Sequence, residues 1–231
     1  LLFRKFCQTA KDTYNSLEGP VIRSPRPNML SLMGSLGPRG LGQLAQLGPM
    51  RTLWQQMCLQ FKDERLRQLF ARYATYCGSS PWEAPATLLL IAQVEMAGVW
   101  SAKGGMTALS NTLMRLAQAR GAEFKFNSPC QQILQTQGRV SGVKLCTGEI
   151  IPADAVVFNG DASALRDGLL SDVVRQAVPS KAPPRSLSAV TWSVYAKAQG
   201  VELDRHNVFF HANYSSEFED IFKHRQLRHQ P

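Results

Sequence analysis

The stretch AEFKFNSPCQQILQTQGRVSGVKLCTGEIIPADAVVFNGD, residues 122–161, decides between an all-helical fold and a mixed one. It divides into short runs with strand character, with turn signals at Gln137-Gly138 and Thr147-Gly148. The predicted strand runs are 122–126, 131–135, 139–146 and 149–159. Ala155 to Phe158 are continuously apolar, which predicts a strand buried on both faces, as in a parallel sheet. The turn Asn159-Gly160-Asp161 follows, and residues 162–170 then predict a helix.

On the N-terminal side of this stretch the pattern is helical. Residues 27–57 are apolar but interrupted by glycine and proline, which predicts several short helices. Residues 63–78 predict a better helix, which stops at its final glycine. Its apolar side chains recur at helical spacing: Leu66, Leu69, Phe70, Tyr73 and Cys77. Residues 86–100 predict an apolar helix that carries Glu95 and is too short to span a bilayer.

A glycine pair, Gly104-Gly105, precedes another predicted helix that ends at Gly121. The apolar stripe of this helix comprises Met106, Leu109, Leu113 and Leu116. A glycine turn before a helix can cradle a phosphate, but no strand of the dinucleotide-binding type precedes this one. Taken from the residues alone, the pair fits a flexible turn that introduces an amphipathic helix.

Further strands are predicted at 186–197 and 207–212, and a helix at 215–222. Helices and strands alternate along the chain, so the predicted fold class is α/β.

The net charge of +9 is compatible with nucleic acid or with an anionic membrane surface. The basic residues are scattered and form no nucleic-acid module, so we expect no nucleic-acid partner. Arg23, Arg26, Arg39 and Arg51, in or beside the apolar region 25–60, suit an anionic membrane, although a solvated basic face explains them equally well. The five cysteines form no CxxC pair and lie far from the four histidines, which argues against disulfides and against a metal site.

Several motifs together resemble the bacterial-type phytoene desaturases, a family of flavin-dependent carotenoid oxidoreductases. In chain order they are RYATYCGSSPWEAPA, GVW, GGM, GAEF, SPCQQI and ADAVVFNGD. The segments RSLSAVTWSVYAKAQG and NVFFHANYSSEFEDIF extend the resemblance to the 1-hydroxycarotenoid 3,4-desaturases, also called hydroxyneurosporene desaturases, within that family.

The resemblance implies a fragment of a two-domain, FAD-dependent fold of the amine-oxidase type. Residues 1–100 would be the helical part of a substrate and membrane-associating domain, 101–165 an FAD-domain segment with a β-meander, and 166–231 further strands and helices of the substrate domain. The family's FAD fingerprint does not occur in this sequence. We therefore expect an internal piece of a longer enzyme that is inactive by itself.

The resemblance also implies FAD contacts at Cys130, through its backbone, and at the turn Asn159, Gly160 and Asp161. Alternatively, Cys130 is a buried small residue, and the turn is a plain one in which Asp161 or Ser163 caps the next helix.

On the substrate side the resemblance implies Gly104, Gly105 and Met106, beside the flavin ring, and Trp82 and Trp100, lining the cavity. Alternatively, both tryptophans are buried in the hydrophobic core and have no role in binding. No catalytic residue is identified.

The activity implied is removal of two hydrogens from an acyclic hydroxy- or methoxycarotenoid, with quinone or oxygen as electron acceptor. The implied location is cytoplasmic, peripheral on the inner, photosynthetic membrane of a bacterium. Another flavin oxidoreductase of the amine-oxidase type, or a non-enzymatic membrane-associated helical protein, are the alternatives.

Overall fold

A computed structural model describes residues 2–26, 28, 34, 42, 51–182, 186–204 and 206–226. The chain forms two compact units, one of Leu1–Trp100 with Ser186–Pro231 and one of Ser101–Arg185. Most of the short helices predicted for 27–57, with Arg39, lie outside the described residues.

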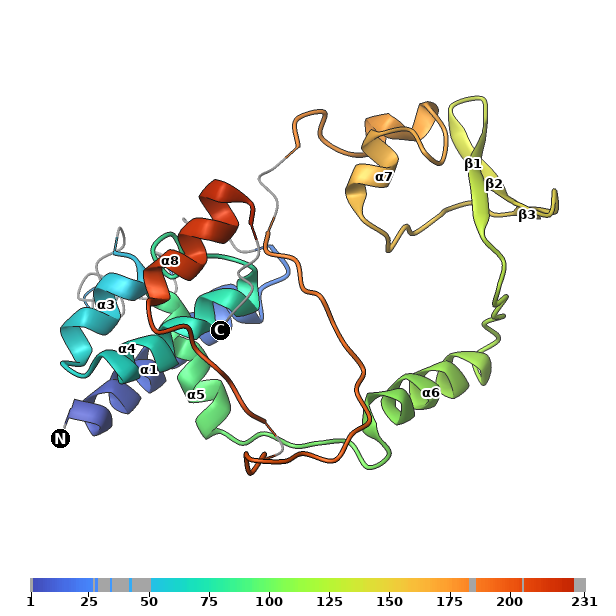
Figure 1. Cartoon of the computed structure of the whole chain (residues 1–231). Helices are drawn as coiled ribbons and strands as arrows, with labels where there is room; N and C mark the ends of the chain where they lie inside the picture. Colours follow the sequence, from blue (N-terminus) through green and yellow to red (C-terminus); the bar gives the residue numbers. More distant parts are fainter. Residues whose placement is uncertain are drawn as a thin grey trace. The chain divides into compact units, whose positions relative to one another are not determined.

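The first unit is helical (Figure 1), as predicted for its described residues before 101. Its α-helices are α1 (Leu2–Leu17), α3 (Leu53–Gln60), α4 (Glu64–Ala71), α5 (Ile91–Met96) and α8 (Tyr214–Glu219). Shorter 3-10 helices are η2 (Arg72–Cys77) and η3 (Ala86–Leu90), and π-helical turns are η1 (Glu18–Ile22) and η5 (Asp220–His224). None of the described helices is both long enough and apolar enough to cross a membrane.

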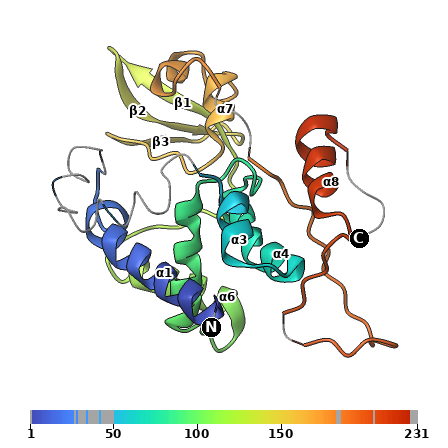
Figure 2. The same cartoon turned by 90° about the vertical axis from the view of Figure 1, so that its left-hand side faces the viewer.

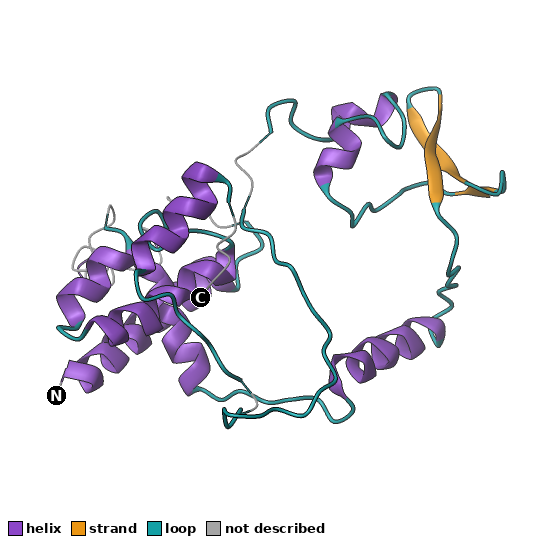
Figure 3. Cartoon of the chain, viewed as in Figure 1, coloured by secondary structure: helices purple, strands orange, loops and turns teal. Residues whose placement is uncertain are grey.

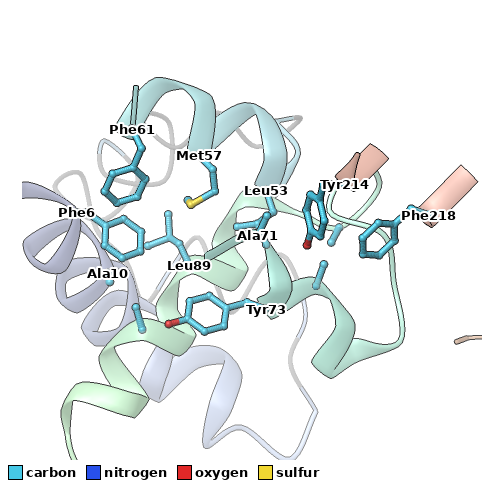
Figure 4. Close-up of a cluster of buried hydrophobic side chains, with 13 residues drawn as sticks. Phe6, Ala10, Leu53, Met57, Phe61, Ala71, Tyr73, Leu89, Tyr214 and Phe218 are labelled. Atoms are coloured by element: carbon cyan, nitrogen blue, oxygen red, sulfur yellow. The ribbon is translucent and has the colours of Figure 1, made fainter. Parts of the chain in front are cut away.

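The core of this unit joins α1, α3, the η3 region and α8 (Figure 4). Phe6, Met57 and Leu89 are completely buried in it. The ring of Phe6 lies 5.1 Å from that of Phe61 and 4.5 Å from that of Phe70. The helical unit is therefore stabilised chiefly by burial of aromatic and aliphatic side chains from distant segments.

Helix boundaries in this unit follow local capping chemistry. Thr52 and Gln55 form a capping box at the start of α3. Asp63 caps α4 by accepting a hydrogen bond from Arg65 N at 3.0 Å. The predicted stop at Gly78 is confirmed, since this residue has φ +63° after η2.

The strands predicted at 186–197 and 207–212 are not formed (Figure 3). Described residues there run as extended chain without a ladder partner. Val190, Trp192 and Val194 are all exposed. The alternation of apolar and polar residues in this segment is typical of a strand, but here no sheet buries its apolar side chains.

The second unit contains an antiparallel sheet in the order β1-β2-β3, accompanied by α7 (Figure 2). The strands are β1 (Cys130–Thr136), β2 (Arg139–Leu145) and β3 (Ile150–Pro152), and the helices are α6 (Gly105–Gln118), α7 (Ala162–Arg166) and the 3-10 helix η4 (Val173–Ala177). Helices together with this sheet confirm a mixed α and β fold.

The predicted hairpin between β1 and β2 is confirmed. Gln137 and Gly138 have φ values of +51° and +77°, and two successive positive values are the mark of the type I′ turn that suits strand twist. In β2, Gly142 is required because a Cβ there would lie 2.3 Å from Ile151 O on β3. Sequence reasoning therefore places the meander correctly.

Two predictions for this unit are wrong. Residues 122–126 form no strand, and Ala155–Phe158 form neither a strand nor part of a parallel sheet. Val156 and Phe158 pack against Ile133, Leu165 and Val174, but Val157 is 94% exposed. An apolar run becomes a doubly buried strand only between two neighbouring strands, and the described residues provide none there.

A polar cluster of Arg72, Tyr73 and Glu95 links α5 to η2 in the helical unit. Glu95 accepts hydrogen bonds from Tyr73 Oη at 2.7 Å and from Arg72 Nη2 at 3.1 Å. Burial, followed by this bond to a carboxylate, raises the pKa of Tyr73. The lone carboxylate in an apolar helix is thus explained by partners on a neighbouring element.

A stability prediction follows from the core. Leu89→Ala should lower the free energy of unfolding by about 2–5 kcal/mol, because it leaves a cavity at a completely buried position. Thermal or urea unfolding of the protein expressed from its complete gene measures this. Leu59→Ala, at a position that is 67% exposed, is the control and should change stability little. Equal losses in both variants would contradict the described core.

A second prediction concerns Tyr214, whose buried hydroxyl has no partner among the described residues. Burial, with the nearby charge of Glu217, raises the pKa of Tyr214. The unfolded chain loses this proton near the ordinary value of about 10, so stability is complete below that pH and declines above it. Tyr214→Phe should stabilise the protein by about 1 kcal/mol at neutral pH and weaken the alkaline decline.

Urea unfolding at neutral pH and above pH ~10 tests the prediction for Tyr214. Tyr195→Phe is the matched control, because the Tyr195 side chain is fully exposed. A Tyr214→Phe variant that is less stable at neutral pH would show that the hydroxyl has a partner after all.

Candidate functional site

A pocket of about 230 Å³ lies in the helical unit, between the turn at 80–83 and the helix pair α8–η5. Its lining includes Trp82, the only site residue expected from the sequence that borders it. Trp82 is half-buried. It therefore belongs both to the core and to a cavity wall, so the two alternatives for this residue are not exclusive.

Aromatic rings form the apolar wall of the pocket. The ring of Trp82 lies 5.5 Å from that of Phe218, and the ring of Phe218 stacks at 6.4 Å on that of Phe222. Behind the wall, Trp82 packs against Trp54 at 4.8 Å and against Tyr214 at 5.6 Å. Phe218 and Tyr214 lie side by side in Figure 4.

Polar groups occur on the same lining. Ser80 is almost fully buried, and its Oγ accepts a hydrogen bond from Trp82 N at 3.2 Å. Glu83 is exposed at the pocket, and no ion pair joins it to another described residue. Lys223 also lines the pocket, but it is paired with Glu219 at 3.1 Å.

Sequence reasoning missed the partners of Trp82 on α8. The signal was present, because Phe218 and Phe222 are four residues apart and share a helix face. What the sequence does not indicate is that this face meets residues 80–83, more than a hundred positions earlier.

Trp100, the second tryptophan expected at the substrate, is 83% exposed and does not line the pocket. Its indole lies over Gly98, where a Cβ would come within 2.4 Å of the ring. The core alternative is therefore wrong for Trp100.

The glycine pair begins α6 as expected. Gly104 and Gly105 have φ values of +84° and +75°, a conformation that favours glycine. Apart from its chain neighbours and the backbone of α6, no described atom lies within 4 Å of a Cβ placed on Gly105, and Met106 is 71% exposed. The backbone at this turn is thus open to close approach by a flat molecule.

Cys130 is exposed at the first position of β1, where it pairs with Leu145. The alternative of a buried small residue is therefore wrong for Cys130. Its Sγ lies 3.6 Å from Gln132 O. All five cysteines of the chain are free thiols.

The turn at 159–161 is exposed. Asp161 caps α7 by accepting a hydrogen bond from Ser163 N at 2.8 Å. This agrees with the alternative in which Asp161 caps the next helix. A Cβ on Gly160 would collide with the ring of Phe158 at 2.3 Å. Capping occupies the Asp161 carboxylate, whereas Asn159 remains exposed at the same turn.

The expected site residues thus occur in both units: Trp82 and Trp100 in the helical unit, and the glycine pair, Cys130 and the turn 159–161 in the sheet unit. Within the described residues, no three His, Cys, Asp or Glu side chains are grouped so that they can bind a metal ion.

Comparison with known proteins places the chain among flavoproteins. The profile of the family described as flavin-containing amine oxidoreductases matches residues 31–195. The hydroxyneurosporene desaturase of Rubrivivax gelatinosus is 55% identical over 97% of this chain and 43% of its own length. The protein of the same name from Cereibacter sphaeroides is 43% identical over 95% of this chain and 44% of its own.

A 1-hydroxycarotenoid 3,4-desaturase from a Flavobacterium species is 32% identical over 98% of this chain and 46% of its own length. The chain therefore spans less than half the length of these relatives, and the expected resemblance to carotenoid desaturases is confirmed. Because the family profile covers more than half of the chain, this chain belongs to the family of flavin-containing amine oxidoreductases.

Proposed function

We propose that the chain is part of an FAD-dependent desaturase, which removes two hydrogens from an acyclic hydroxylated carotenoid. The observation that carries this proposal is the 55% identity to a hydroxyneurosporene desaturase over nearly the whole chain. Identity at this level, continuous across both compact units, supports a shared reaction as well as a shared fold.

The residues expected near FAD fit such a group through their backbone. Gly104 and Gly105 are exposed and without side chains, so a flat ring can lie directly against the main chain. Cys130 and Asn159 are also exposed. We propose that Cys130 and Asn159, with Gly160 and Asp161, contact FAD, whose chemistry when bound is to accept a hydride from the substrate.

The part of this chain in the reaction is to bind and orient an apolar substrate. Trp82 and its aromatic neighbours provide an apolar wall that excludes water from one part of the substrate. Trp100, Gly104, Gly105 and Met106 are proposed to contact the polyene, supported by their exposure. No side chain is proposed as an acid or a base.

We further propose that the enzyme is peripheral on a bacterial photosynthetic membrane and passes electrons to a quinone or to oxygen. Carotenoids are apolar and partition into membranes. The exposed basic residues Arg23 and Arg26, in a chain of net charge +9, favour an anionic surface. Arg23 forms an ion pair with Glu18, in which Nη2 lies 2.8 Å from Oε1. Arg26 is therefore the better candidate for contact with an anionic membrane surface.

The proposed reaction predicts a spectroscopic change. The protein expressed from its complete gene, with hydroxyneurosporene as substrate, should shift the carotenoid absorption to longer wavelength, because desaturation lengthens the conjugated system. Absorption spectra of extracted pigments, with bound FAD confirmed separately, measure this. An unshifted spectrum from protein that holds FAD would contradict the proposed function.

The glycine turn provides a sharper test. Gly105→Ala should lower kcat/KM for desaturation at least tenfold, because a methyl group would intrude between backbone and the flat molecules. Gly138→Ala is the matched control: Gly138 has φ +77° against +75° for Gly105, and both have open space at the Cβ position. Both variants share a backbone cost of about 1–2 kcal/mol. Equal activity in the two would refute a role for Gly105 at the site.

A further inference from the structure

The pocket beside Trp82 is too small for a complete carotenoid. Its volume is about 230 Å³, whereas pockets for whole drug-sized ligands measure roughly 300–1,000 Å³. A pocket of this size that is lined by aromatic rings fits one end of a longer apolar molecule.

The pocket lining combines apolar walls with hydrogen-bonding groups. Trp82, Phe218 and Phe222 provide continuous aromatic surface for a branched hydrocarbon end. The hydrogen bond described for Ser80 Oγ is one that it accepts, from Trp82 N, so its own proton is available for donation. The carboxylate of Glu83 is an acceptor on the same lining.

These groups match the needs of an alcohol. A hydroxyl group has one proton to donate and lone pairs that accept, so Glu83 can receive its proton while Ser80 donates to its oxygen. A purely hydrocarbon end would leave the buried Ser80 proton without an acceptor, which is unfavourable.

We propose that this pocket is the subsite for the hydroxylated end of the substrate, with Ser80 and Glu83 as its specificity-determining residues. The inference rests on the proposed function, since it takes the carotenoid substrate from there. The names of the relatives specify hydroxylated carotenoids, and one places the hydroxyl at position 1, at the end of the chain.

Such a subsite has a consequence for which bond reacts. Burial of a polyene in an apolar tunnel is non-directional, so it does not fix how far the molecule slides along its own axis. Hydrogen bonds to the terminal hydroxyl fix that position. The pocket would therefore fix one end of the polyene along its own axis.

The test compares two substrates, neurosporene and hydroxyneurosporene, with the protein expressed from its complete gene. Ser80→Ala and Glu83→Gln should each raise the Kd and KM for hydroxyneurosporene about tenfold, whereas neither variant should raise those for neurosporene. Quenching of tryptophan fluorescence measures binding, and pigment absorption measures turnover. Phe222→Trp, which fills the pocket, should weaken binding of hydroxyneurosporene without altering FAD content.

Ser79→Ala is the control, because Ser79 adjoins Ser80 but does not line the pocket. Glu83 is exposed, so Glu83→Gln tests the subsite even if Ser80→Ala misfolds. Equal losses for both substrates, or no loss of binding in any pocket variant, would overturn the subsite. If the unaltered protein binds hydroxyneurosporene through the pocket but never desaturates it, the proposed function fails while the subsite stands.

Discussion

The contact of α8 with Trp82 is the interaction on which the candidate site depends. Tyr214 and Phe218 are buried against Trp54 and Trp82, with ring centroids 5–6 Å apart. These rings join segments separated by more than a hundred residues, so their burial must offset a large entropy of loop closure. Without this contact the pocket would lose the wall formed by Phe218 and Phe222.

Buried polar groups next to these aromatic rings lower the stability of the helical unit where they lack hydrogen-bond partners. The hydroxyl of Tyr214 has no hydrogen-bond partner among the described residues, and neither has Arg72 Nε. By contrast, the carboxylate of Glu95 receives hydrogen bonds from both Tyr73 and Arg72. The helical unit thus contains one carboxylate with hydrogen bonds from two side chains, and two buried polar atoms whose missing partners lower its stability.

Local chemistry made part of the fold predictable. The cap at Asp161 and the Gln137-Gly138 turn act within a few residues, so the sequence alone indicates them. Strands at 186–197 and at Ala155–Phe158 were predicted wrongly because a strand also needs a partner, which no local pattern supplies. The candidate site follows the same rule. Trp82 was expected there from the resemblance, whereas its neighbours on α8 depend on tertiary packing.

Under the proposed function, the chemistry of the substrate explains why a small pocket of mixed polarity would matter. A polyene presents nearly the same surface at each repeat along its length, so an apolar tunnel alone distinguishes neither its two ends nor its many bonds. In the proposed subsite, the buried hydroxyl of Ser80 and the carboxylate of Glu83 would distinguish them, because an unmet hydrogen bond in an apolar pocket discriminates more strongly than an added methylene. In the proposed subsite, the aromatic residues would supply affinity for the substrate, and Ser80 and Glu83 would supply its orientation.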